Sequence, residues 1–143
     1  MPEKNTSELE TELSKSDDVK DFIATNEDNL RDLTLKDYLR KLLAEKNLVK
    51  AQVIRDSELS ESYAKKIFRG NTKRPAREKI LPLALAMQLS PQETDYLLYY
   101  SGNEKLYVRN DWDAVIFFAL ENQKTVAQTN ALLDELHMTP LLG

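Results

Sequence analysis

The chain has 143 residues, of which 41% are hydrophobic and 31% charged, a composition typical of a soluble globular protein. Cysteine is absent, which excludes disulfide bonds, thiol catalysis and thiolate metal sites and fits a reducing cytoplasm. The longest apolar run, residues 114–120, is too short to span a bilayer, and the acidic N-terminus lacks the apolar segment of a secretory signal. We expect one small domain with appendages.

The net charge of −4 is distributed unevenly along the chain. Residues 1–30 hold 3 basic and 9 acidic side chains, whereas residues 60–80 hold 7 basic and 2 acidic ones. Residues 31–59 hold 7 basic and 5 acidic side chains, and residues 81–143 hold 3 and 8. Because affinity for DNA depends on local neutralisation of phosphates, a basic patch on an acidic body is compatible with DNA binding. The alternative is a solvated charged face with no partner.

Residues 1–33 are rich in acidic and polar side chains and hold few apolar ones. Such a segment forms either marginal helices that dock weakly or a disordered acidic arm. The sequence leaves open whether this arm screens the basic patch or only keeps the chain in solution. We place the domain boundaries so that residues 1–33 are the arm, residues 34–105 a central domain and residues 106–143 a C-terminal helical pair.

The first helix of the central domain is predicted to begin after Thr34, a good N-cap residue, and to end near Asn47. Asp37 in its first turn complements the helix dipole. Apolar residues recur at helical spacing along one side of this segment, which indicates an amphipathic helix. These inward positions are Leu35, Leu39, Leu42 and Leu43.

Two short helices with a tight break between them follow, over residues 50–56 and from Ser60 to Gly70. Ser60 is the predicted N-cap of the second helix, and Gly70 supplies the left-handed residue that ends it. Two short helices joined by a turn of three to four residues form a helix-turn-helix unit, whose second helix can enter a major groove. The inner side of that helix is formed by Tyr63, Ala64, Ile67 and Phe68.

The outward residues of this second helix are the candidates for contacts to bases. Lysine can donate to guanine O6 and N7, and glutamate can accept from cytosine N4. The sequence does not decide which of them reaches a base and which a phosphate. The base candidates are Glu61, Ser62, Lys65 and Lys66. The phosphate candidates are Lys50, Arg69, Asn71, Thr72, Lys73, Arg74 and Arg77.

A further helix is predicted from about Ala76 to Met87, with Pro82 inside it. Because proline removes a hydrogen bond and clashes with the preceding turn, this helix is either kinked or begins later. Ser90 and Glu93 then form a capping box that opens the next helix.

Residues 111–141 repeat the pattern of residues 76–106 with an offset of 35 residues, which predicts a second capped helical pair. Asn110 or Asp111 caps its first helix. That helix is so apolar that more than one side must be buried, against the core and either the N-terminal arm or a second subunit. The predicted packing or dimerisation residues are Trp112, Val115, Ile116, Phe117 and Phe118. For the group Tyr96, Tyr99, Tyr100 and Tyr107, core or subunit packing is favoured over base stacking.

Residues 34–101 resemble the Xre-type helix-turn-helix domain of the phage Cro and lambda-repressor-like regulators. The resemblance rests on the Arg69-Gly70 ending with the later Pro75, and on Ala84, Ala86, Met87, Leu89 and Ser90 before the last helix. It implies an all-α fold, namely a five-helix lambda-repressor-like bundle with a C-terminal helical hairpin and an acidic N-terminal arm. Glu58 occupies a turn position where glycine is usual and is strained if its φ is positive.

The leading hypothesis is a cytoplasmic transcriptional regulator, a repressor that binds double-stranded DNA as a homodimer on a two-fold operator. The alternative is a protein-interaction adaptor that keeps the scaffold but no longer binds DNA, which the acidic body, Glu58 and Glu61 favour. We do not expect an enzyme, since His137 is the only histidine and no catalytic constellation or glycine-rich phosphate loop is present. No cofactor, metal or membrane partner is predicted.

Overall fold

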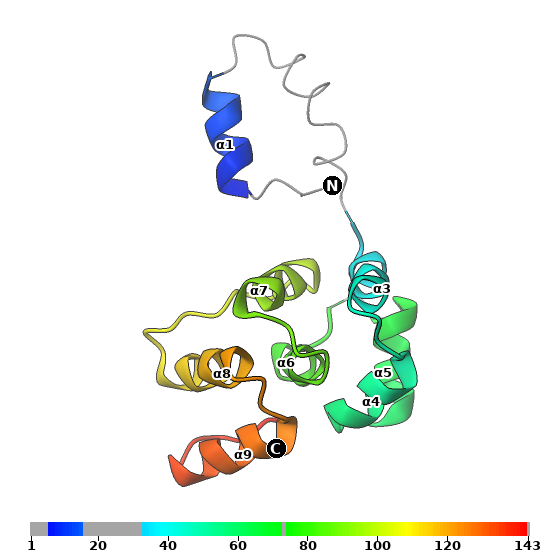
Figure 1. The fold of residues 1–143 in the computed structure, drawn as a ribbon, viewed down its shortest axis with the longest axis vertical. Coiled ribbons are helices and arrows are strands. Elements are labelled where there is room, and N and C mark those ends of the chain that lie inside the picture. Colours follow the sequence, from blue (N-terminus) through cyan, green and yellow to red (C-terminus); the bar gives the residue numbers. More distant parts are fainter. Residues whose placement is uncertain (1–5, 16–32, 73, 143) are drawn as a thin grey trace. The chain divides into compact units, whose positions relative to one another are not determined.

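A computed structural model describes residues 6–15, 33–72 and 74–142 of the chain. All regular secondary structure in these residues is helical, in eight helices, which confirms the predicted all-α class (Figure 1). None of the described helices combines the length and apolarity needed to traverse a lipid bilayer. The chain divides into two compact units, residues 1–32 and residues 33–143, so the predicted central and C-terminal segments lie in one unit.

The described part of the first unit is a single helix, α1 (Thr6–Lys15). Within it the Thr11 hydroxyl donates to the backbone oxygen of Ser7 at 3.0 Å, and Glu8 and Glu10 are exposed. Their carboxylates make α1 an acidic helix. The remainder of the predicted N-terminal arm, apart from Leu33, lies outside the described residues.

The second unit holds the other seven helices, and five of them begin at a side-chain cap, whereas α4 and α6 begin after Val49 and Ala76 without one. Thr34 Oγ1 accepts a hydrogen bond from Asp37 N at 3.1 Å, and Asn110 Oδ1 accepts one from Asp113 N at 3.0 Å. Asn110, rather than Asp111, is therefore the cap of its helix. The helices are α3 (Leu35–Glu45), α4 (Lys50–Ser57), α5 (Glu61–Arg69), α6 (Arg77–Ala86), α7 (Pro91–Tyr100), α8 (Asp111–Glu121) and α9 (Val126–Glu135).

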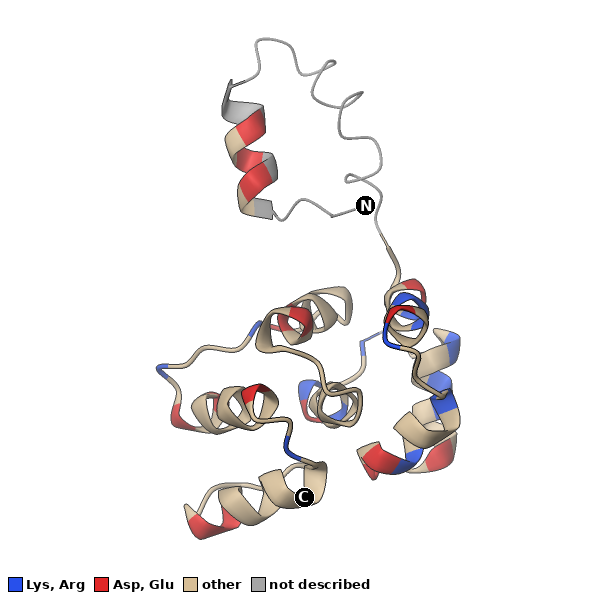
Figure 2. Ribbon diagram, viewed as in Figure 1, with Lys and Arg blue, Asp and Glu red and all other residues tan. Residues whose placement is uncertain are grey.

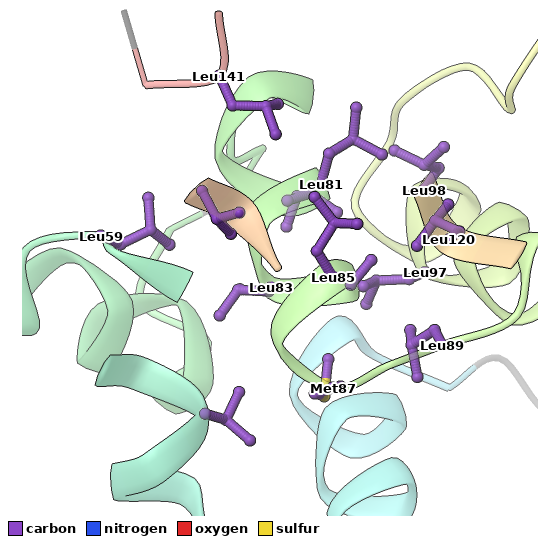
Figure 3. Close-up of a cluster of buried hydrophobic side chains, with 14 of the residues drawn as sticks. Leu59, Leu81, Leu83, Leu85, Met87, Leu89, Leu97, Leu98, Leu120 and Leu141 are labelled. Atoms are coloured by element: carbon purple, nitrogen blue, oxygen red, sulfur yellow. The ribbon is translucent and has the colours of Figure 1, made fainter. Parts of the chain in front are cut away.

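Helix α6 is the centre of this unit, because it contacts α4, α7, α8 and α9. Every residue from Ile80 to Leu85 is buried, as expected of a helix that is apolar on all sides. Pro82 lies within a helix that begins at Arg77, so the later start allowed by the sequence is not adopted. Figure 3 shows buried side chains of α6, α7 and α8 clustered with others from the connections and from the C-terminal segment. The labelled residues are Leu59, Leu81, Leu83, Leu85, Met87, Leu89, Leu97, Leu98, Leu120 and Leu141.

The predicted repeat of residues 76–106 in residues 111–141 is confirmed by matching hydrogen bonds. Both second helices, α7 and α9, begin with a capping box, formed by Ser90 with Glu93 and by Thr125 with Gln128. The later bonds correspond too: Leu106 N donates to Asp95 Oδ1 at 2.9 Å, and Leu141 N donates to Asn130 Oδ1 at 2.7 Å. In each helical pair, an apolar residue after the second helix is therefore hydrogen-bonded to that helix through its backbone N–H: Leu106 to α7 and Leu141 to α9.

Helix α8 is buried on more than one side, as its composition predicts, but its partners belong to the same unit. It contacts α6, α7 and α9, so neither the N-terminal arm nor a second subunit is needed to cover Val115 and Ile116. Trp112 is half-buried and its indole N–H donates to the backbone oxygen of Thr139 at 2.7 Å. Of the five residues predicted for packing or dimerisation, only Phe118 is largely exposed, at 49%.

Candidate nucleic-acid interface

The connection between α4 and α5 consists of three residues, Glu58 to Ser60. Glu58 has φ 61° and ψ 12°, the left-handed conformation, so the strain expected at this position is present. For a residue with a Cβ this conformation costs about 1 kcal/mol. Leu59 is buried, and its N–H donates to the hydroxyl of the buried Ser57 at 3.2 Å. The buried Leu59 side chain and the buried Ser57 hydroxyl thus hold this turn in place.

Helix α5 buries one side and exposes the other. Ser60 Oγ accepts from Tyr63 N at 3.3 Å at its start. Ala64, Ile67 and Phe68 are buried, and α5 contacts both α3 and α4. The four residues predicted to point outward do so, since Glu61, Ser62 and Lys66 are exposed and Lys65 is half-exposed.

The outward face of α5 carries an ion pair of its own. Lys65 Nζ lies 2.7 Å from Glu61 Oε1, one turn away on the same helix. The hydrogen bond from Lys65 and its positive charge lower the pKa of the Glu61 carboxyl. Because the pair is exposed, it adds little to stability. Its effect is that Glu61 neutralises part of the positive charge that Lys65 presents to the solvent.

A cation that the sequence did not single out lies at the C-terminal end of α5. Gly70 has φ 76°, and a Cβ built there would lie 3.4 Å from Lys36 Cβ on α3. Lys66 and Arg69 are exposed on the last turn of α5. Cations are favoured near a helix C-terminus, so Lys66 and Arg69 stabilise the end of α5, and the half-buried side chain of Lys36 packs beside Gly70 at the same end. No local signal places Lys36 there, because only the packing of α3 on α5 does so.

Lys50 approaches α5 from the start of α4. Its Nζ lies 5.9 Å from the centroid of the Phe68 ring, within range of a cation–π interaction. Phe68 belongs to α5 and is buried, whereas Lys50 is exposed. The predicted phosphate candidate at the start of α4 therefore lies beside the end of α5.

The loop after α5 is hydrogen-bonded to the segment that follows α7. Asn103 Nδ2 donates to the backbone oxygen of Pro75 at 3.0 Å. The exposed Arg74 lies beside Gly102, since a Cβ built at Gly102 would be 3.6 Å from Arg74 Cγ. Asn71 is exposed and Thr72 half-buried, while the predicted phosphate candidate Lys73 lies outside the described residues.

Arg77 is bound within the unit, which disfavours its predicted role as a phosphate contact. Its two terminal nitrogens donate to Asp113 Oδ1 and Oδ2 at 2.9 and 2.8 Å, and its Nε donates to the backbone oxygen of Glu104 at 3.0 Å. A further bond of 3.2 Å reaches the backbone oxygen of Lys105. The Arg77 guanidinium therefore joins α6 to α8 and to the segment that precedes α8.

The carboxyl of Asp113 is held in its charged form by this arrangement. Burial raises the pKa of Asp113, but the hydrogen bonds and charge of Arg77 and the bond from Tyr107 N together outweigh it. The net pKa lies below the usual value of 3.8. Asp113 is therefore a buried anion paired with Arg77.

Within the described part of the second unit, α7, α8 and α9 carry acidic but no basic residues, whereas α3 and α5 carry more basic than acidic residues. Figure 2 shows Lys and Arg positions on α5 and on α3 beside it, and Asp and Glu positions on α7, α8 and α9. Such a local basic surface is the electrostatic requirement for binding a phosphate backbone. No family model, curated protein or solved structure matches the chain.

Proposed function

We propose that the chain is a sequence-specific transcriptional regulator, a repressor of the Xre type, that places α5 in the major groove of double-stranded DNA. The observation that supports this most is the outward face of α5, where Glu61, Ser62 and Lys66 are exposed and Lys36 of α3 and Lys50 of α4 lie near the C-terminal end of the helix. A helix of 9 residues is about 13 Å long, comparable with the roughly 12 Å width of the major groove.

In this proposal the outward residues of α5 have different tasks. Ser62 and Lys66 are exposed and contact base edges directly. Glu61 accepts from cytosine N4, and its pair with Lys65 orients its carboxylate. Lys65 is a weaker source of positive charge, because Glu61 partly neutralises its ammonium.

The cations around α5 hold the phosphate backbone and set the register of the helix in the groove. Lys36, Lys50 and Arg69 all lie near the C-terminal end of α5, so the phosphates that they would contact lie at that end of the helix. To the sequence-derived set we add Lys36, and from it we remove Arg77. The proposed phosphate contacts are Lys36, Lys50, Arg69, Asn71, Thr72, Lys73 and Arg74.

The experiment is selection of preferred sites from random DNA, followed by a salt titration of binding to the selected site. Lys66→Ala is expected to lose about 1–3 kcal/mol of discrimination at one base pair. Arg74→Ala is expected to weaken binding to all sequences and to reduce the salt slope by about 0.9. Lys124→Ala, a cation change between α8 and α9, is the matched control and should alter neither.

The result that would contradict the proposal is binding that is weak, independent of salt and the same in all three variants.

One observation favours a second candidate, a protein-interaction adaptor on this scaffold. Glu61 stands at the start of the outward face and neutralises Lys65, which lowers the positive charge available to DNA. Pull-down from a lysate separates the candidates, because an adaptor retains its partners after nuclease treatment whereas a DNA-binding regulator loses them.

A further inference from the structure

We propose that Asn103 is a positioning residue for Arg74, so that the segment after α7 sets how the loop after α5 meets a phosphate. Asn103 lies outside the α4–α5 unit, 28 residues beyond the Pro75 whose carbonyl it binds. This role rests on the proposed function, because holding a cation in place matters to binding only if a phosphate backbone is the partner.

The side chain of Asn103 joins the loop to α7. Its Nδ2 donates to the backbone oxygen of Pro75 at 3.0 Å and to Ser101 Oγ at 2.9 Å, so both N–H groups of the amide have partners. Ser101 is buried, and its hydroxyl donates to the backbone oxygen of Leu98 at 3.0 Å. The backbone N–H of Asn103 donates to the same Leu98 oxygen at 2.8 Å. The donor that holds the loop is therefore itself fixed to the last turn of α7.

The acceptor of this bond lies directly after Arg74. Pro75 is buried, and its ring fixes its own φ. A proline also restricts the residue before it to an extended backbone, which here is Arg74. A hydrogen bond at the Pro75 carbonyl therefore constrains the backbone from which the Arg74 side chain projects.

The same segment also lies against the stem of the Arg74 side chain. A Cβ built at Gly102 would lie 3.6 Å from Arg74 Cγ and 3.7 Å from Arg74 Nε. Arg74 is exposed and forms no ion pair with another described residue, whereas the guanidinium of Arg77 is bound to Asp113. Of these two arginines, Arg74 is thus the one whose charge can meet an anion outside the unit.

An arginine held in this way suits a phosphate contact. Its planar guanidinium can donate two parallel hydrogen bonds to phosphate oxygens, but only from a defined direction. A side chain that is ordered before binding loses less conformational freedom on binding. Asn103 therefore affects DNA binding without touching DNA, because it orders the backbone that carries Arg74.

The experiment is a salt titration of DNA binding by Asn103→Ala, Arg74→Ala and the double variant. Asn103→Ala should reduce the salt slope by up to about 0.9, and Arg74→Ala should reduce it little further in that background. Without DNA, NMR order parameters of the Arg74 and Ala76 amides should fall in Asn103→Ala. Asn103→Leu should act in the same way, because it keeps a side chain of similar size but has no N–H₂.

Asn122→Ala is the matched control, because it removes a bond of the same kind, from Asn122 Nδ2 to the backbone oxygen of Phe118 at 2.9 Å at the end of α8. It should change neither the salt slope nor the two order parameters. Far-UV circular dichroism checks that each variant keeps its helices, and Asn103→Leu gives the answer if Asn103→Ala alters the fold.

The outcomes separate this role from the proposed function. A wild type that does not bind DNA would overturn both. DNA binding whose salt slope falls in Arg74→Ala but in neither Asn103 variant would overturn the role of Asn103 alone. So would unchanged order parameters in both Asn103 variants, fully additive losses in the double variant, or an equal loss in Asn122→Ala.

Discussion

Replacing Asp113 with Asn tests whether the Arg77–Asp113 pair holds α6 and α8 together. The substitution keeps the shape of the side chain but removes its charge and turns an amide N–H₂ toward the guanidinium. Breaking a buried ion pair by removing one partner costs about 3–5 kcal/mol. The side chain of Asp113 is 9% exposed and that of Arg77 25%, so Arg77 keeps some hydration and the loss should be near the lower value, about 3 kcal/mol.

A loss of this size is a large part of the stability of a domain of about one hundred residues, and it should lower the melting temperature by roughly 10–20 °C. Thermal and urea denaturation followed by far-UV circular dichroism measure it. The double variant Arg77→Met with Asp113→Leu should recover most of the loss, because an apolar pair leaves no charge buried alone. A loss below about 1 kcal/mol for Asp113→Asn would refute the reasoning, since it would mean that water screens the pair.

The same pair also distinguishes the structural role of Arg77 from the phosphate contact that the sequence predicted. If Arg77 only joins helices, Arg77→Met lowers the melting temperature while the salt slope of DNA binding, measured well below that temperature, is unchanged. If it contacts a phosphate, the slope falls by about 0.9.

Three further predictions concern pH, the turn and the ion pair on α5. Because the folded pKa of Asp113 is depressed, its contribution to stability is present above the unfolded value of 3.8 and is lost as pH falls below it. The melting temperature of wild type should therefore approach that of Asp113→Asn in acid, and a constant difference would contradict this. Glu58→Gly should raise the free energy of unfolding by up to about 1 kcal/mol, because glycine tolerates φ 61°. A lower free energy of unfolding in urea denaturation would show that the turn is not strained. Glu61→Gln releases Lys65 from its partner, so binding to nonspecific DNA should strengthen and its salt slope rise by about 0.9. An unchanged slope would mean that Lys65 does not face the phosphates.

Features that depend on near neighbours in the chain were predictable from sequence. Thr34, Ser60, Ser90 and Thr125 each accept a backbone hydrogen bond three residues ahead, and a short side-chain oxygen at that distance suffices to start a helix. The inward and outward sides of α5 follow from the 3.6-residue period in the same way. The offset repeat was also visible, because both of its copies use the same caps.

Features that depend on contacts between distant parts of the chain were not predictable from sequence. Arg77 lies within a basic stretch, and nothing near it indicates that its partner is Asp113, 36 residues away. Lys36 joins the cations of α5 only because α3 packs on that helix. Val115 and Ile116 could be assigned to a core or to an interface with equal reason, since both bury apolar side chains.

The sequence by itself determined the helices, their caps, their buried sides and the location of the basic segment, because each depends on backbone bonds and periodicity within a few residues. Only the tertiary structure decided which cations are exposed, which carboxylate is buried beside Arg77, and which aromatic residues remain open at the surface. Those properties depend on which helices pack together, and packing joins residues whose separation along the chain carries no local signal.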